Sequence, residues 1–220
     1  SYTSSTLTPS ATGDGTFTSS NPVVSGYDIS LISSGYIRQI NATSSSGGTW
    51  TESAEYWSDG TKIYFSQRNS DIIKVFSLST AYDITTIAGT SSSEYTLSAD
   101  AWAIRVNSAG TKIWVAYDAS IEQFTLSSSH DISTASSDGT WTIGTFIRDI
   151  RFNDDGTKIY IADINSDDIK QYSLTTAYDI TGTKTLDGSI TGLTNPTSIL
   201  FNSDGSKLYY GQQNNSSVYV

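Results

Sequence analysis

Two arginines at matching places in the sequence are the first candidates for a binding site. Arg105 lies in the string Ile-Arg-Val-Asn and Arg151 in the string Ile-Arg-Phe-Asn. Guanidinium groups bind carboxylates and phosphates through paired hydrogen bonds, so two of them side by side could hold an anionic ligand. Glu55 occupies the same place in a preceding segment. An ion pair between Glu55 and Arg105 would instead make the arginines part of the framework, and this second interpretation is favoured.

Oxygen-bearing side chains are regularly spaced in one loop. Asp163, Asn165 and Asp167 occupy positions 1, 3 and 5, as the ligands of a calcium loop do. Position 6 is Asp168 rather than glycine, and position 12 is Leu174 rather than a bidentate glutamate. These departures favour a polar loop that needs no metal.

Aromatic side chains are a third possible source of binding chemistry, because their rings can stack on sugars. The chain has 5 Trp and 14 Tyr. Most of them occupy strand positions that recur along the chain, which favours a place in the core. Tyr117 and Tyr210 lie next to loops, so we expect these two rings to be exposed and to contact a ligand.

Groups for nucleophilic or metal catalysis are scarce. The absence of cysteine excludes thiolate nucleophiles, disulfides and iron–sulfur clusters, and a single histidine excludes sites that need two imidazoles. That residue, His130, stands where other segments have tyrosine, and we expect it to be an exposed variant of that position. A glycosidase would need two carboxylates that face each other across a cleft. With 22 acidic residues some pairs must exist, so their number indicates nothing.

The composition limits the class of partner. The formal net charge is −10, and only 15% of the residues are charged, which argues against a nucleic-acid surface rich in Lys and Arg. The longest apolar run, 113–117, is far too short to span a bilayer, and residues 1–10 show no signal-peptide pattern. Hydrophobic residues make up 36% of the chain, enough for a folded core.

The candidate residues lie on a repeat. A string of the type Asp-Gly-Thr-Lys-Ile-Tyr recurs around Gly60, Gly110, Gly156 and Gly205, at spacings of 50, 46 and 49 residues. A second string, Ala-Tyr-Asp-Ile-Thr or a variant of it, recurs every 48 residues at three aspartates, which are Asp83, Asp131 and Asp179. The repeat also carries lysines at 62, 112, 158 and 207. We interpret these lysines as solubilising charges at exposed strand starts rather than as a cationic ring.

Each repeat predicts four short strands. In the second full unit these are 104–107, 112–115, 121–126 and 140–143, and the weaker fourth strand of the next unit is 184–186. The glycine supplies the positive φ of the hairpin between the first two strands. Four antiparallel strands every 46–50 residues is the period of a β-propeller blade.

We therefore predict an all-β propeller of about five four-stranded blades. A four-bladed ring, or an incomplete ring closed by another chain, is the alternative. Residues 1–20 are rich in Ser and Thr and form a tether or a closing strand, and residues 21–220 form a single propeller domain. Within the diverged first unit, residues 26–30 (Gly-Tyr-Asp-Ile-Ser) match the repeated turn string.

The repeat resembles one found in bacteriophage virion proteins and in large surface proteins of aquatic bacteria. The resemblance lies in the strings Asp-Gly-Thr-Lys-Ile-Tyr and Asp-Asp-Ile-Lys-Gln-Tyr-Ser-Leu-Thr-Thr-Ala-Tyr-Asp-Ile-Thr, and it covers roughly residues 51–220. It implies a propeller scaffold in a virion appendage, a capsid decoration or an adhesin. It carries no catalytic residues.

From these observations we expect a non-enzymatic structural or binding protein on a virion or at the cell surface. Its partners would be other virion or surface proteins, host-surface glycans, or copies of itself, and it would need no cofactor or metal. Two alternatives stay open, a carbohydrate-active, glycosidase-like propeller enzyme and a self-assembling structural tile. The weak candidates for ligand contact are Tyr117, Tyr210, Arg105, Arg151, Asp163, Asn165 and Asp167.

Overall fold

The described part of the chain is built of antiparallel strands. The computed structural model describes residues 50–56, 59–68, 70–213 and 215–219. The strands are β1 (Trp50–Tyr56), β2 (Lys62–Arg68), β3 (Ile72–Ser77), β4 (Ser93–Thr96), β5 (Ala103–Val106), β6 (Lys112–Ala116), β7 (Ser120–Leu126), β8 (Ala135–Thr142), β9 (Ile147–Phe152), β10 (Lys158–Asp163), β11 (Asp168–Leu174), β12 (Lys184–Ile190), β13 (Pro196–Phe201), β14 (Leu208–Gln212) and β15 (Asn215–Tyr219). Two 3₁₀ turns, η3 (Ile84–Thr86) and η4 (Ile132–Thr134), complete the list. In this part of the chain no helix is long and apolar enough to cross a membrane.

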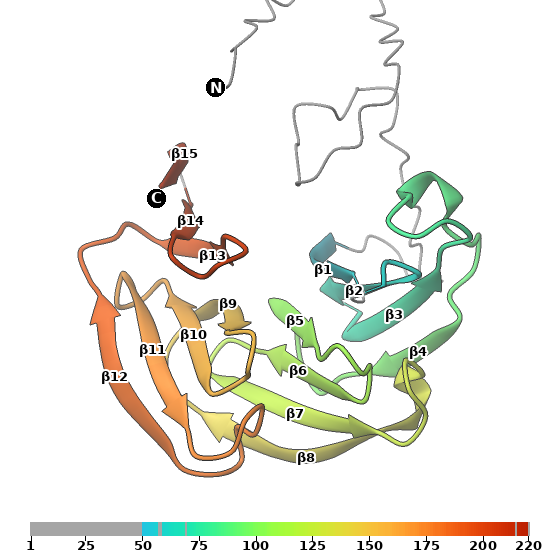
Figure 1. Ribbon diagram of the computed structural model, residues 1–220, viewed down its shortest axis with the longest axis horizontal. Helices are drawn as coiled ribbons and strands as arrows, with labels where there is room; N and C mark the ends of the chain where they lie inside the picture. Colours follow the sequence, from blue (N-terminus) through green and yellow to red (C-terminus); the bar gives the residue numbers. More distant parts are fainter. Residues whose placement is uncertain (1–49, 57–58, 69, 214, 220) are drawn as a thin grey trace, which may run out of the picture. The chain divides into compact units, whose positions relative to one another are not determined.

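The strands form four separate sheets, each a simple meander (Figure 1). Three sheets have four strands, in the orders β1-β2-β3-β4, β5-β6-β7-β8 and β9-β10-β11-β12. The fourth described sheet has three strands, β13-β14-β15. Within each sheet, every strand pairs with the one that follows it in sequence, as the repeat predicts for blade-like units.

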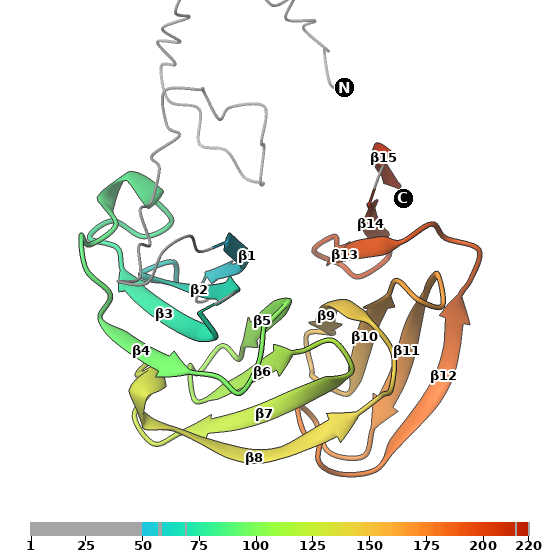
Figure 2. The same cartoon turned by 180° about the vertical axis from the view of Figure 1, so that it is seen from behind.

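Successive sheets adjoin along their first strands. β1 contacts β5, β5 contacts β9, and β9 contacts β13. Hydrogen bonds from the backbone of β5 and of β13 cross two of these boundaries: the N–H of Ile104 donates to Ser53 Oγ at 3.3 Å, and the N–H of Ile199 donates to Asp149 Oδ2 at 2.7 Å. Both views show β5 and β9 next to each other and β8 and β12 at the outer edges (Figures 1 and 2). First strands together and fourth strands outward is the arrangement of propeller blades.

The cores lie between neighbouring sheets. One cluster joins the first and second sheets and includes Tyr64, Ile73, Ile104 and Phe124. A second joins the second and third sheets around Trp114, which is 1% exposed. A smaller cluster of Ala162, Ile169 and Ile199 joins the third and fourth. A single sheet cannot cover both its faces, so the burial of these residues holds the sheets in sequence.

The repeated hairpin glycine is required by an aromatic ring. Gly156 has φ +69°, and a Cβ built on it would lie 2.2 Å from the ring of Tyr178. The N–H of Tyr178 also donates to the carbonyl of Gly156 at 2.8 Å. The same ring-over-glycine contact recurs at Gly60 with Tyr82 and at Gly110 with His130. Glycine is therefore needed both for its left-handed backbone and for the space that the ring fills.

The repeated aspartate begins the turn that presents this ring. Asp83 Oδ1 accepts hydrogen bonds from the N–H and hydroxyl of Thr85, at 3.0 and 2.6 Å, and so caps η3. Asp131 and Asp179 make the same pair of contacts with Ser133 and Thr181. This side-chain cap explains why the strings Asp-Ile-Thr and Asp-Ile-Ser recur.

Two of the fourth strands, β8 and β12, are longer than the sequence predicts, and each carries a β-bulge. β8 begins at Ala135, and Asp138 is the extra residue opposite the step from Gln123 to Phe124. In β12, Asp187 has the same place opposite the step from Gln171 to Tyr172. Bulges interrupt the period of two by which strands are read from sequence, so the prediction began too late in β8 and ended too early in β12.

The prediction for His130 was wrong, and some predictions fall outside the described residues. The His130 side chain is buried, with 7% of the residue exposed, and its Nδ1 is 3.0 Å from the Tyr64 hydroxyl. It replaces the tyrosine ring over Gly110, so it is enclosed by the neighbouring sheet. The predicted segment 1–20, the turn string at 26–30 and the strand that would complete a fifth blade lie outside the described residues.

Candidate functional site

Charged side chains from the first strands of three sheets converge. Glu55 comes from β1, Arg105 from β5 and Arg151 from β9. Glu55 Oε2 lies 3.3 Å from Nη1 of Arg105 and 3.5 Å from Nη1 of Arg151. The ion pair between Glu55 and Arg105 that the repeat suggested is therefore present, and Glu55 also holds the second arginine. The structure brings Arg105 and Arg151 together, as the anion-binding interpretation requires.

Asp149 is the member of this cluster that the sequence interpretation missed. Its Oδ1 pairs with Nη2 of the buried Arg105 and accepts the N–H of Ile150 at 2.8 Å. Its Oδ2 accepts the N–H of Ile199 in the fourth sheet. The position of Asp149 within the repeat could have identified it. Asp149 precedes Arg151 by two residues, as Ser53 precedes Glu55, and Ser53 Oγ accepts the N–H of Ile104.

The two arginines differ in what they can offer a ligand. Arg105 is 7% exposed and is held by two carboxylates and by the carbonyl of Ile104. Arg151 donates its Nε to the carbonyl of Ile199 at 2.9 Å, and its side chain is 28% exposed. Burial lowers the pKa of Arg151, as does the charge of Arg105, while Asp149 and Glu55 counter both. The guanidinium remains a cation at any physiological pH and is the one that a ligand can reach.

Both arginines line a cavity of about 350 Å³, which we call the arginine pocket. Its lining residues are Glu55, Arg105, Val106, Asn107, Ser108, Trp114, Arg151, Phe152, Asn153, Asp154 and Tyr178. Asp154 is exposed, at the turn between β9 and β10, and makes no ion pair with any described residue. The pocket thus combines a reachable cation, a solvated carboxylate, amides and aromatic faces.

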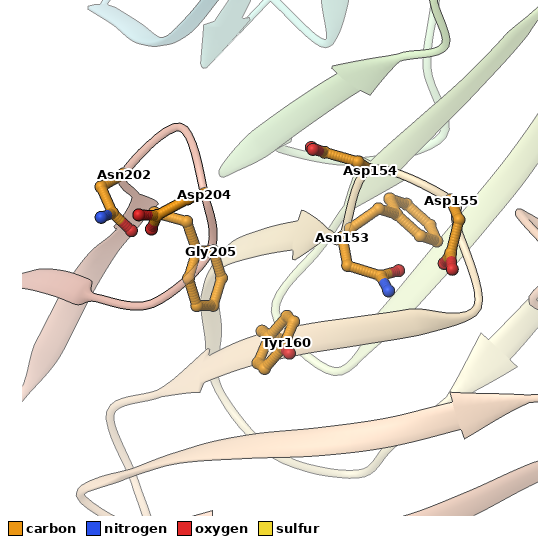
Figure 3. A pocket seen from close by; sticks show the side chains of 9 residues that line it. Asn153, Asp154, Asp155, Tyr160, Asn202, Asp204 and Gly205 are labelled. Carbon is orange, nitrogen blue, oxygen red and sulfur yellow. The ribbon is translucent and has the colours of Figure 1, made fainter.

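A second cavity, of about 290 Å³, adjoins the first along Phe152, Asn153 and Asp154. We call it the aspartate pocket, and it is lined by Phe152, Asn153, Asp154, Asp155, Tyr160, Phe201, Asn202, Asp204 and Gly205. Figure 3 shows the turns 153–155 and 202–205 on either side of Tyr160. In the fourth sheet Leu200 replaces the arginine of the repeat and is 56% exposed, so the cationic side of the site ends at Arg151.

The loop with calcium-like spacing is held by a lysine. The ammonium of Lys170 lies 2.5 Å from Asp163 Oδ2 and 2.8 Å from Asp168 Oδ1. Asp163 Oδ1 also accepts the hydroxyl of Thr145 and the N–H of Asn165. Burial would raise the pKa of Asp163, but hydrogen bonds from Lys170, Ser166 and Thr145, together with the charge of Lys170, lower it to about 2.

The three loop residues do not form a common site. Asp163 is buried, whereas Asn165 is exposed. Asp167 accepts the N–H of Asn195 at 2.7 Å, so it ties the loop to the start of the fourth sheet. The described residues contain no cluster of three or more acidic or histidine side chains placed to hold a metal ion.

The expectation that Tyr117 is exposed was wrong. Only 6% of the residue is exposed, because its ring packs in the cluster between the first two sheets and its hydroxyl donates to Glu122 at 3.0 Å. Tyr210 is half-buried against the cluster between the third and fourth sheets. Neither ring lines the two pockets, and the aromatic residues that do are Trp114, Phe152, Tyr160, Tyr178 and Phe201.

Two of the repeated lysines form ion pairs within their own sheets. Lys112 pairs with Asp138 at 3.0 Å, and Lys158 pairs with Asp187 at 2.7 Å. Both partners are the bulge residues of the fourth strand of the same sheet. The pairs argue against a cationic ring at these two lysines and give them a role within the sheet that the interpretation as solubilising charges did not include.

Comparison with known proteins identifies the fold. No family model and no curated protein matches the chain. Among solved structures, a candidate 6-phosphogluconolactonase from Bacteroides fragilis is 13% identical, with a TM-score of 0.58, over 77% of this chain and 49% of that one. The periplasmic gluconolactonase of Pseudomonas aeruginosa is 10% identical, with a TM-score of 0.56, over 77% and 49%. The β-propeller domain of Swd1 from Myceliophteria thermophila is 12% identical, with a TM-score of 0.52, over 75% and 51%. The fold is a β-propeller.

The chain spans about half the length of these structures. At 10–13% identity the likeness shows the fold alone, and the specific resemblance to phage and bacterial surface repeats stays a prediction.

The expected function needs correction. We predicted a non-enzymatic virion or surface scaffold, but the similar structures include two candidate 6-phosphogluconolactonases and one gluconolactonase. These neighbours favour the alternative of a carbohydrate-processing propeller over the scaffold, and they are at odds with the expectation of no enzymatic activity. The prediction of a scaffold rested on the repeat alone. The repeated residues specify the strands and turns of each blade, and they carry no information about the pockets between blades.

Proposed function

We propose that this chain is part of a carbohydrate-processing propeller that hydrolyses the lactone of a sugar acid in the arginine pocket. The observation that carries the proposal is the presence of Arg151 and Asp154 in one cavity of about 350 Å³. A reachable guanidinium can stabilise the negative charge that develops in acyl transfer. A solvated carboxylate can act as a general base. Similar folds described as lactonases support this choice of reaction.

The reaction would use this chain's residues as follows. The Asp154 carboxylate takes a proton from a water molecule as the water oxygen bonds to the lactone carbonyl carbon. The carbonyl oxygen becomes an oxyanion beside the Arg151 guanidinium. When the carbonyl re-forms, the bond to the ring oxygen breaks, and the proton passes from Asp154 to that oxygen. The product is the open hydroxy acid, whose carboxyl group then loses its proton to solvent.

The other charged groups act as positioning residues. Glu55 holds both arginines, and Asp149 neutralises Arg105, so that the buried Arg105 does not need a ligand. Arg151 is left as the cation that a carbonyl or carboxylate of the sugar can approach. The charge balance of the buried groups is therefore complete before the substrate binds.

We place the activity outside the cytoplasm, with soluble carbohydrates as partners. The low charge density and the abundance of Ser and Thr suit an extracellular setting, and one similar structure is a periplasmic enzyme. The substrate would be a small sugar lactone or a lactone at the end of a short oligosaccharide.

A pH-stat assay tests the proposal with the full chain and two substrates, glucono-δ-lactone and its 6-phosphate. We expect acid release above the spontaneous rate. Asp154→Asn should lower kcat/KM about 100-fold, as loss of a general base does. Arg151→Gln should lower it about tenfold or more. Asp59→Asn is the matched control, because Asp59 is an exposed aspartate in the equivalent turn of the first sheet and lines neither pocket. A folded protein that only matches the spontaneous rate, or an Asp154→Asn variant with full activity, contradicts the proposal.

A further inference from the structure

The hydrogen-bond donors of Arg151 are partly committed to the protein itself. Its Nε donates to the carbonyl of Ile199 at 2.9 Å, and its Nη1 lies 3.5 Å from Glu55 Oε2. A guanidinium binds a phosphate through two parallel N–H groups, taken either from Nε and one Nη or from both Nη atoms. In Arg151 each of these pairs has one member that already contacts an acceptor of the protein. The side chain is therefore suited to a single oxygen, such as a carbonyl oxygen or one oxygen of a carboxylate.

The charge of Arg105 is matched by carboxylates. Its guanidinium pairs with Asp149 and with Glu55, and its Nη1 also donates to the carbonyl of Ile104. The side chain is buried, and so is its Nε, which a ligand in the pocket does not reach. Together, Glu55 and Asp149 supply two negative charges for the two guanidiniums of the cluster.

The lysines of the two hairpins beside the arginine pocket are occupied as well. Lys112 Nζ lies 3.0 Å from Asp138 Oδ2, and Lys158 Nζ lies 2.7 Å from Asp187 Oδ2. Neither lysine lines the pocket. Among the residues that do line it, the positive charges are those of the two arginines, and both arginines have partners in the protein.

The backbone of the same two hairpins also has committed donors. Asn107 Oδ1 accepts the N–H groups of Thr111 and Lys112 at 2.8 and 2.9 Å. Asn153 Oδ1 accepts the N–H of Lys158 at 2.8 Å. A phosphate-binding turn directs several successive N–H groups at the ligand. Here these three N–H groups donate to side-chain amides, so they do not serve an anion in the pocket.

The remaining charged group of the pocket is negative. Asp154 is exposed and lines the arginine pocket, and its charge adds to those of the two carboxylates that balance the arginines. A phosphate monoester carries about −1.5 to −2 charges at pH 7 and would be repelled by Asp154. A lactone ring is neutral, and the acid that its hydrolysis releases has a single charge spread over two oxygens.

We propose that the arginine pocket selects sugar lactones and sugar acids that carry no phosphate, and that Glu55 determines this specificity. Glu55 stands at the place that arginine takes in the next two sheets, and its carboxylate contacts both guanidiniums. This one residue therefore supplies a negative charge where the repeat would supply a third cation, and it occupies donors of the other two. The inference rests on the proposed function and narrows its substrate to an unphosphorylated sugar.

Calorimetric titration of the full chain with gluconate and with 6-phosphogluconate tests the selection without any reaction. We expect gluconate to bind about tenfold more tightly or better, because the phosphate meets a like charge and no paired donors. The difference should narrow as the ionic strength rises, since salt screens the repulsion by Asp154. Equal affinities, or a preference for 6-phosphogluconate, would overturn the selection. A preference of the same size at low and high salt would mean that shape excludes the phosphate, and it would overturn the assignment to charge.

A variant of Glu55 tests its role as the specificity-determining residue. Glu55→Gln keeps the length of the side chain and removes its charge, so the affinity for 6-phosphogluconate should rise about tenfold and that for gluconate should rise less. Glu94→Gln is the matched control. Glu94 is another glutamate of the first sheet, it pairs with Lys74 at 3.0 Å and it does not line the arginine pocket. This variant should bind both probes as the wild type does.

Folding of each variant is checked by thermal unfolding. If Glu55→Gln does not fold, Glu55→Asp takes its place, because it keeps the charge of the cluster and withdraws the carboxylate from Arg151. Its preference for gluconate should also weaken. A folded variant at position 55 that keeps the full preference of the wild type would show that Glu55 does not set the specificity.

Hydrolysis assays separate this inference from the proposed function. Lactone hydrolysis that depends on Asp154 and is equally fast with glucono-δ-lactone and its 6-phosphate would leave the proposed function standing and overturn the selection. A preference for gluconate over 6-phosphogluconate that Glu55→Gln reduces, without any lactone hydrolysis, would do the reverse.

Discussion

The Asp149 carboxylate accepts the backbone N–H of Ile199 in the next sheet, with 2.7 Å between Oδ2 and N. Its other oxygen pairs with Arg105 of the preceding sheet. One buried side chain therefore connects three successive blades near the candidate site. Ser53 makes the equivalent contact from the first sheet to Ile104, without a charge.

The first prediction concerns this connection. Asp149→Ala should lower the free energy of unfolding by about 3 kcal/mol, because it leaves the buried Arg105 short of a counter-charge and the Ile199 N–H without an acceptor. Asp149→Ser should recover part of the loss by imitating Ser53. Urea denaturation measures both. Asp154→Asn, an exposed site, should change stability by less than about 0.5 kcal/mol. A loss below 1 kcal/mol for Asp149→Ala would show that the carboxylate does not hold the blades together.

The second prediction separates backbone strain from ring packing at two glycines. Gly156 and Gly205 both have φ +69°, but only Gly156 lies against a ring. Gly205→Ala should cost about 1–2 kcal/mol, the price of a left-handed alanine. Gly156→Ala should cost roughly 2 kcal/mol more, because the new Cβ displaces Tyr178. Chemical denaturation measures both variants. Equal losses of unfolding free energy for Gly156→Ala and Gly205→Ala would show that the Tyr178 ring moves aside without cost, against this prediction.

The third prediction uses the single histidine. Burial lowers the pKa of His130, Lys62 lowers it further and Asp59 partly opposes them, while the Tyr64 hydroxyl contacts Nδ1. A histidine with a lowered pKa in the folded state binds its proton more readily when unfolded. Stability should therefore fall as the pH drops below the unfolded value of 6.5. His130→Phe keeps a ring over Gly110 and should remove this dependence. Denaturation at pH 8 and pH 5.5 checks it, and an equal slope in both proteins would contradict it.

The fourth prediction concerns the loop that Asp163 holds. Its folded pKa of about 2 lies below the ordinary value of 3.8, so its contribution is complete above pH 3.8 and is lost as the pH falls toward 2. Between pH 5 and pH 3 the wild type should lose up to about 1 kcal/mol more than Asp163→Asn. Denaturation curves at the two pH values measure the difference, and parallel losses in wild type and Asp163→Asn would exclude the role.

Much of the fold could be predicted because the same turn residues recur in every unit and determine the structure of their near neighbours. Gly110 and Gly156 mark hairpins by their positive φ, and Asp131 and Asp179 mark caps that use only the next two residues. Such features act over a few residues and leave a pattern at the same place in every unit. The bulges at Asp138 and Asp187 were missed because they change register without a residue type that demands it.

The candidate site could be predicted only in part. Arg105 and Arg151 were found because they occupy one repeat position, and their approach follows from the stacking of first strands. Asp149 was missed because its partners lie 44 and 50 residues away, in sheets on either side. The aspartate pocket arises between two blades, and no single segment of the sequence contains it.

The sequence by itself determined the strands, the hairpins, the capped turns and the order of the blades, because hydrogen bonds between near neighbours specify them. Only the tertiary structure decided that Tyr117 and His130 are buried and that the ammonium of Lys170 pairs with Asp163. The physical reason is distance along the chain. Burial and charge pairing in a propeller depend on the blade that packs alongside, and that blade is encoded almost fifty residues away.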